Sequence, residues 1–362
     1  FLDVPPKGIG EATVGKLNEA PREAGLRISD LLRVSTFEDG EPYARLMEAL
    51  GGGQAVVFDT ETTGRDTGRD EIVEIAAARC GWEGIRQEYH AWIAPARCVG
   101  SSEAVHGYSD EFLARHGRPE RDVLREFLAF CGDAVLAGHN LAGFDMPILE
   151  ARLAVNGMSL PDGLRCFDTL DISRRLFRLP GYRLADLAAS LCLQSEPSHK
   201  AADDVRATVE LLLLLASRLK EGARVRAEAV SKLGERFRHH ARLIESWREA
   251  SFRLRPYELL ERLLEDSGIR RHFAGSPDGE RRLSHLRELG ALFERLDTPE
   301  LPPRLALLEA LNSAALGTDL DRHAGEADLV PVLTVHQAKG LEFDNVFVAN
   351  ATDSEFPSWR SL

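Results

Sequence analysis

The stretch AVVFDTETTG, residues 55–64, decides the fold of the central part of this 362-residue chain. Four apolar residues lead into Asp59 and Glu61, two positions apart at the end of a predicted strand. Because side chains alternate along a strand, both carboxylates lie on the same side of it. Such a pair on a mostly buried strand is costly unless something positive compensates it, and a divalent cation does so most directly. The simpler alternative is that the two carboxylates lie at an exposed end of the strand and need no compensating cation.

The elements expected around this strand are those of an α/β domain. The glycines at 51–53 break the preceding pattern, so a domain boundary is expected near residue 52. Residues 1–50 before it are expected to form a loop and short amphipathic helices. After it come helices as far as about residue 220 and further strands at 71–80, 87–95 and 134–140.

The sequence changes character after residue 220. Residues 221–298 combine helical apolar spacing with many charges, and a proline-containing break follows at 299–303. Two β-branched apolar runs, 330–335 and 345–351, predict buried strands joined by a polar loop. A separate, mostly helical region is therefore expected beside the α/β domain.

Composition limits the class of protein. The chain is 44% hydrophobic and 28% charged, as in ordinary globular proteins, and no apolar run approaches the roughly 20 residues of a membrane span. Five cysteines without a CxxC pair argue against disulfides and structural zinc, which indicates the reducing cytoplasm. The opening has neither Met nor a secretion signal, so the chain is expected to be a piece of a longer protein.

The net charge of −13 leaves nucleic-acid binding open, because a binding groove needs only a local positive field. The segment 218–248 holds nine lysines and arginines against four glutamates. It could lie along a phosphate backbone. A solvated helix face is the alternative reading of the same charges.

Two later motifs bring further candidates for an active site. In GHNLAGFD, residues 138–145, Asp145 follows an apolar strand at the start of a helix, where an aspartate alone is more often a cap. In HKAADD, residues 199–204, His199 precedes a helix and Asp204 lies five residues on. A histidine and a carboxylate are thus presented together.

The motifs DTETTG, GHNLAGFD and H-x-x-x-x-D, in this order, resemble the DnaQ (proofreading epsilon subunit) exonuclease family. The resemblance implies a ribonuclease H-like α/β fold, with a mixed sheet flanked by helices, over residues 55–220. It also implies that His199 is the general base and that two Mg²⁺ or Mn²⁺ ions are bound by Asp59, Glu61, Asp145 and Asp204. Asp203 is a rival to Asp204, and the family spacing favours Asp204.

These residue types suit phosphodiester hydrolysis. Two cations about 3.5–4 Å apart can activate a water and stabilise the leaving 3′ oxygen. An imidazole can accept the proton of that water near neutral pH. The family further suggests that Thr62, Thr63 and His106 line the pocket of the 3′-terminal nucleotide, whereas turn chemistry is an alternative role for the two threonines. His139 and Asn140 are expected to be structural.

Both ends of the chain resemble Rep/UvrD-type superfamily 1 helicases. The opening resembles the 2B subdomain, in which the turn of Lys7, Gly8 and Gly10 would contact duplex DNA through backbone N–H groups. The ending resembles a motif of the second motor domain, which touches nucleotide and single-stranded DNA through Thr334, His336, Lys339, Gly340 and Glu342. A phosphate-binding GxxxxGK[ST] loop is absent, so no ATPase or helicase activity is expected from this chain alone.

Four segments are therefore expected: 1–51, the first part of a helicase 2B-like domain; 52–221, the exonuclease; 222–328, the second, helical part of the 2B-like domain; and 329–362, a fragment of motor domain 2A. The function expected is a metal-dependent 3′-to-5′ exonuclease that releases nucleoside monophosphates from single-stranded or frayed DNA 3′ ends, within a helicase of DNA repair or replication. Duplex DNA would bind the 2B-like part, and ATP only the full-length helicase. The alternatives are a non-catalytic DNA-binding module and an RNA-trimming exonuclease.

Overall fold

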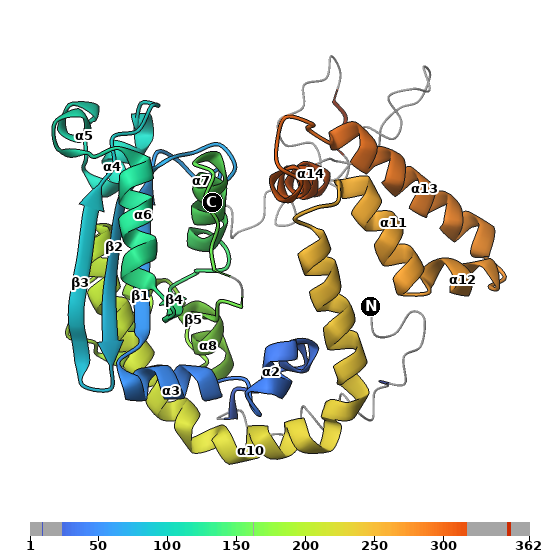
Figure 1. Ribbon diagram of the computed structural model, residues 1–362, viewed down its shortest axis with the longest axis horizontal. Helices are drawn as coiled ribbons and strands as arrows, with labels where there is room; N and C mark the ends of the chain where they lie inside the picture. Colours follow the sequence, from blue (N-terminus) through green and yellow to red (C-terminus); the bar gives the residue numbers. More distant parts are fainter. Residues whose placement is uncertain (1–8, 10–23, 162, 317–345, 349–362) are drawn as a thin grey trace. The chain divides into compact units, whose positions relative to one another are not determined.

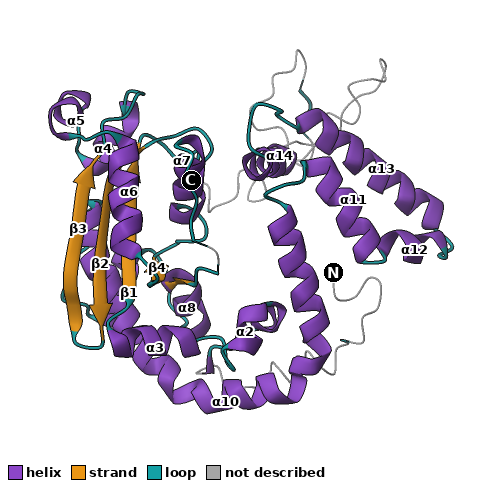
Figure 2. Cartoon of the chain, in the orientation of Figure 1, coloured by secondary structure: helices purple, strands orange, loops and turns teal. Residues whose placement is uncertain are grey.

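The apolar runs of the central region become strands of one mixed sheet (Figure 2). The computed structural model describes residue 9 and residues 24–161, 163–316 and 346–348. The strands are ordered β3-β2-β1-β4-β5, antiparallel from β3 to β1 and parallel from β1 to β5. They are β1 (Ala55–Thr62), β2 (Ile72–Gly81), β3 (Gly84–Trp92), β4 (Val135–Gly138) and β5 (Cys166–Asp168). The predicted mixed sheet is confirmed, with the short β5 as an addition.

Helices flank this sheet and form most of the rest of the described chain (Figure 1). Up to residue 191 they are η2 (Ile28–Leu32), α2 (Val34–Glu38), α3 (Ala44–Gly52), η3 (Gly100–Ser102), α4 (Glu103–His106), α5 (Asp110–His116), α6 (Glu120–Cys131), α7 (Asp145–Val155), α8 (Thr169–Leu176) and α9 (Leu184–Leu191). Beyond it they are α10 (Ala201–Ala250), α11 (Pro256–Asp266), α12 (Ile269–Ala274), α13 (Gly279–Leu296) and α14 (Pro303–Leu316). None of these described helices has the length and apolar character needed to cross a membrane.

The two faces of the sheet are buried by different helices. Val56 and Phe58 of β1 belong to a core cluster with residues of α6 and α7. Ala55 and Val57, which alternate with them, belong to a cluster with residues of α3, α9 and α10. Alternation along β1 therefore decides which layer of helices each polar residue at its end meets.

The helix α10 is 50 residues long and crosses the expected boundary between residues 221 and 222 without interruption. No proline occurs between residues 201 and 250 to end it, and the next one, Pro256, begins α11. The first half of α10 packs on the sheet. In the second half, Val230 and Phe237 form a cluster with Ile9 and Leu31 from the beginning of the chain.

Buried ion pairs reinforce the packing of the N-terminal segment, defined here as residues 24–43. The Arg175 guanidinium of α8 lies 2.6 Å from Asp30, and the two side chains are 4% and 2% exposed. Arg226 of α10 lies 2.6 Å from Glu41. The residues preceding β1 and those in the middle of α10 thus pack as one body.

The chain divides into two compact units, Phe1–Ala310 and Leu311–Leu362. The expected division into four segments stays a prediction. Of the two strands expected near the end, the first lies outside the described residues. Of the second, Val346, Phe347 and Val348 are described, and these three exposed residues form no strand.

Candidate active site

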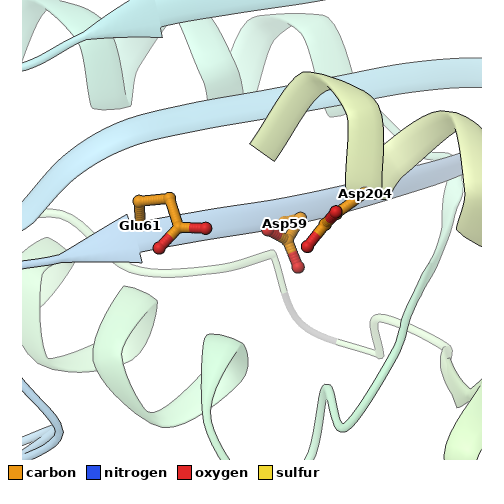
Figure 3. Close-up of side chains that lie close together, drawn as sticks. All are labelled: Asp59, Glu61 and Asp204. Atoms are coloured by element: carbon orange, nitrogen blue, oxygen red, sulfur yellow. The ribbon is translucent and has the colours of Figure 1, made fainter. Parts of the chain in front are cut away.

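The pleat of β1 presents two carboxylates to the layer that contains α10. Asp59 and Glu61 continue the alternation of Ala55 and Val57, which are buried on that face. Asp204 lies in the first turn of α10. One carboxylate oxygen from each of Asp59, Glu61 and Asp204 lies within 4.8 Å of the others. Figure 3 shows the two β1 side chains with Asp204 reaching them from the helix.

Burial and mutual repulsion disfavour the charged forms of these carboxyl groups. Burial, followed by the charges of Asp204, Glu74 and Asp145, raises the pKa of Glu61 to about 8. Burial and the neighbouring carboxylates, Asp145 first, raise the pKa of Asp59 well above its usual value. The pKa of Asp204 is also raised, mainly by burial. Full ionisation of this cluster therefore requires a compensating positive charge.

The cluster offers the donor atoms that a hard divalent cation prefers. All three groups are carboxylates, and Mg²⁺ and Mn²⁺ are bound in proteins mainly through oxygen. The raised pKa values mean that cation binding would displace protons from the cluster. The residues present thus fit a divalent cation.

Asp145, the fourth predicted metal ligand, lies near Asp59 in the opposite layer and is not one of the three converging carboxylates. It is the first residue of α7 and is 3% exposed. Its Oδ1 accepts hydrogen bonds from the Thr60 backbone N–H at 3.0 Å and from the Thr60 hydroxyl at 2.7 Å. Burial raises the pKa of Asp145 to about 7, and the bonds from Thr60 oppose that rise. The role of Thr60 was not predicted, although its place between the two carboxylates of β1 makes it face α7.

His199 lies in the turn before α10, beside Asp204. It is exposed and has a φ of 57°, in the left-handed region, and it lies close enough to Asp204 to oppose the rise in the pKa of that carboxyl. The backbone N–H of Ser198 donates to Asp204 Oδ1 at 2.9 Å, which ties this turn to the helix. Asp203 instead accepts from the Ser198 hydroxyl at 2.7 Å and lies 3.5 Å from Arg206. Between the rival aspartates, Asp204 is the one in the cluster.

The two threonines expected at the substrate make hydrogen bonds within their own turn. The Thr62 hydroxyl donates to the Gly64 carbonyl at 2.5 Å. The Thr63 hydroxyl donates to Asp70 at 3.0 Å. These hydrogen bonds match the alternative role, in which the two threonines stabilise a turn. A substrate role for Thr62 and Thr63 stays a prediction.

His106, the third expected substrate residue, is 2% exposed. Its Nδ1 accepts from the Tyr108 backbone N–H at 3.1 Å, so Nε2 carries the ring proton and donates to the Ser102 hydroxyl at 3.0 Å. Burial lowers the pKa of His106, which favours the neutral form of the ring. His139 similarly bonds the Thr169 hydroxyl at 3.0 Å and a backbone carbonyl at 3.0 Å, in agreement with a structural role.

The residues expected to contact DNA or nucleotide in the helicase-like parts lie outside the described residues. They are Lys7, Gly8, Gly10, Thr334, His336, Lys339, Gly340 and Glu342. The charged face of α10 is described, and several of its basic side chains are paired with glutamates one turn away, as in a solvated helix face. These are Arg224, Lys232, Arg238 and Arg248.

Sequence comparison identifies the family. The profile described as "UvrD-like helicase C-terminal domain" matches residues 1–362. The chain belongs to this family. Within the UvrD-like chain, 220 residues are 32% identical to a DNA polymerase III PolC-type of Thermotoga maritima, a match that covers 59% of this chain and 16% of the relative. The UvrD-like chain therefore spans about one-sixth of the length of that relative.

Two of the solved structures that match this chain each cover less than half of it. E. coli exonuclease I in complex with a dT13 oligonucleotide is 18% identical, with a TM-score of 0.43, over 46% of this chain and 42% of that one. Exonuclease X in complex with 5′ overhanging duplex DNA is 24% identical, with a TM-score of 0.39, over 48% of this chain and 98% of that one.

Proposed function

We propose that this UvrD-like chain is a metal-dependent 3′-to-5′ exonuclease that releases nucleoside monophosphates from DNA 3′ ends. The observation that carries the proposal is the convergence of Asp59, Glu61 and Asp204 from two separate elements onto one point. Asp145 lies at the same end of β1, and His199 lies beside Asp204. A cluster of partly buried carboxylates next to an exposed histidine is costly for folding and suits hydrolysis at phosphorus.

The carboxylates, His199 and Thr60 have different parts in this reaction. Asp59, Glu61, Asp145 and Asp204 would hold two Mg²⁺ or Mn²⁺ ions. Such ions supply Lewis acidity and a nucleophilic water when bound. His199 accepts the proton of the attacking water on an unprotonated ring nitrogen, and its exposed position lets it return that proton to solvent. Thr60 keeps the Asp145 carboxylate in place through two hydrogen bonds.

The comparisons support DNA as the substrate and a helicase as the context. The PolC-type relative is by name a DNA polymerase, and its match covers 59% of this chain. The UvrD-like family supports a helicase context. We further propose that this helicase acts in DNA repair or replication, and that ATP would bind only to the full-length helicase. Duplex DNA would then contact the 2B-like part through Lys7, Gly8 and Gly10, and Thr62, Thr63 and His106 would line the pocket of the terminal nucleotide.

The test is digestion of a 5′-labelled single-stranded DNA and a matched RNA by the full chain with Mg²⁺, Mn²⁺ or chelator. Stepwise shortening from the 3′ end is expected, and Asp204→Asn is expected to abolish it. Asp203→Asn is the matched control, because this neighbouring carboxylate pairs with Ser198 and Arg206 and should leave digestion intact. Equal activity of the two variants would refute the assigned site.

The alternatives are distinguished by the same experiment. Shortening of RNA in preference to DNA identifies an RNA-trimming enzyme that uses the same residues. Binding of DNA without shortening, in the presence of either cation, identifies a non-catalytic binding module. Shortening that persists in chelator would contradict the metal-dependent mechanism itself.

A further inference from the structure

Glu74 of β2 lies next to the carboxylate cluster and is not a member of it. Its side chain is 1% exposed, and its backbone pairs with that of Glu61 across the antiparallel strands. Directly paired residues present their side chains on the same face of a sheet, so Glu74 faces the α10 layer as Glu61 does. The group that could hold a cation nevertheless consists of Asp59, Glu61 and Asp204.

Both oxygens of Glu74 are occupied by hydrogen-bonding partners. Oε1 accepts from the Tyr108 hydroxyl at 2.9 Å and lies 2.6 Å from His90 Nε2. Oε2 accepts from the Ala201 backbone N–H at 2.9 Å. A buried carboxylate is tolerated when it is satisfied in this way. The partners come from three elements, which are β3, the segment after α4, and α10.

The Glu74 carboxylate caps the N-terminus of α10 through its bond to Ala201, although it lies on a strand far away in the sequence. Ala201 is the first residue of the helix, where backbone N–H groups have no partner within the helix and negative charge is favourable. Lys200, at the capping position, provides no side-chain hydrogen bond. Glu74 fills that place from 127 positions away and thereby fixes the start of α10 to β2.

We propose that Glu74 is a positioning residue of the active site. It holds the first turn of α10 so that Asp204 and His199, three residues after and two before Ala201, meet the carboxylates of β1. This inference deepens the proposed exonuclease function and rests on it. Without the bond to Ala201 the turn is free to shift, and a misplacement of about 1 Å in a catalytic group can reduce a rate on the order of 10²-fold.

The experiment measures Mn²⁺ binding to the full chain by calorimetry without DNA, together with kcat and KM on labelled single-stranded DNA. Glu74→Ala is expected to weaken Mn²⁺ binding and to lower kcat by about 10–100-fold, with little change in KM. Tyr108→Phe is the matched control, because it removes one donor to Oε1 and leaves the Ala201 bond. This variant is expected to keep both quantities within about threefold of the original.

Glu74→Met provides a second variant in case Glu74→Ala does not fold, since methionine fills the volume and replaces both carboxylate oxygens. The original Mn²⁺ affinity and kcat in the folded variants, with only a lower melting temperature, would overturn the proposal. Failure of the proposed function is recognised separately. No digestion of DNA or RNA by the original chain would remove the exonuclease assignment, and Mn²⁺ binding by the Glu74 variants would still decide whether this residue positions the cluster.

Discussion

Arg226 is completely buried in the middle of α10, and removal of its partner Glu41 should destabilise the protein strongly. Its Nε donates to Glu41 at 2.6 Å, its Nη1 donates to the Ala24 carbonyl at 2.9 Å, and its guanidinium lies 4.9 Å from the centre of the Tyr43 ring. Glu41→Ala leaves this cation without its counter-charge. The loss of one partner from a buried ion pair costs about 3–5 kcal/mol.

That free energy converts to a measurable shift in melting temperature. Each kcal/mol lowers Tm by roughly 2 °C in the larger single domains, so Glu41→Ala should lower it by about 6–10 °C. Differential scanning calorimetry gives the value. The matched control is Glu48→Ala, because Glu48 also pairs with an arginine, at 2.7 Å, with side chains 49% and 70% exposed. Exposed pairs contribute less than about 1 kcal/mol.

Two results would refute this reasoning about Glu41. Equal Tm values for Glu41→Ala and Glu48→Ala would show that burial of the Arg226 pair adds nothing to its strength. The double variant Glu41→Leu with Arg226→Met separates charge from packing, because it removes both charges and keeps the apolar volume. Its Tm should lie close to the original value. A Tm as low as that of Glu41→Ala would mean that lost packing, and not an uncompensated charge, causes the effect.

Three further predictions concern the active site. Thr60→Val removes a hydrogen bond that lowers the pKa of Asp145, so activity at pH 7 should fall about tenfold and the pH–rate profile should move to higher pH; an unchanged profile contradicts this. His199→Ala should lower kcat by about 10²–10⁴-fold and keep Mn²⁺ binding, as measured by calorimetry; loss of both would make His199 structural. The pKa of Glu61 is about 8 in the folded, metal-free protein and 4.5 in the unfolded chain. Between pH 4.5 and pH 8 the folded protein therefore keeps the Glu61 proton, whereas the unfolded chain releases it. Tm in chelator should therefore fall as pH rises from 5 to 8, and Mn²⁺ should raise Tm most at pH 8; a Tm that rises over this range counts against the raised pKa.

The sheet and the two carboxylates of β1 could be predicted because their signals are local. Four apolar residues followed by Asp59 and Glu61 specify both a strand and the side on which its charges lie. Asp204 could be chosen over Asp203 only by family spacing, and the structure shows that the two side chains turn to different partners. A strand of three residues, such as β5, carries too little pattern for recognition.

The contacts that fix the site could not be predicted because they join residues far apart in the sequence. Thr60 and Asp145 are 85 positions apart, and Glu74 and Ala201 are 127 positions apart. A threonine and a glutamate within strands are unremarkable residue types, and their hydrogen-bond partners are set by tertiary packing. The continuation of α10 past residue 221 is likewise supported by tertiary contacts, which include the cluster of Phe237 with Leu31.

The path of the chain is compatible with the proposed insertion of a nuclease within a helicase domain. An inserted domain requires that the chain enter and leave at neighbouring points. Here the N-terminal segment leads directly into the α/β part and packs against the middle of α10, the helix by which the chain leaves it. The first turn of α10 carries Asp204, and its second half packs with Leu31 and Ile9. Since one helix serves both the site and the flanking segments, a chain cut at residue 221 would lose Arg226 and expose the apolar surface of the N-terminal segment. Separation of the α/β part from its flanking segments should therefore weaken both.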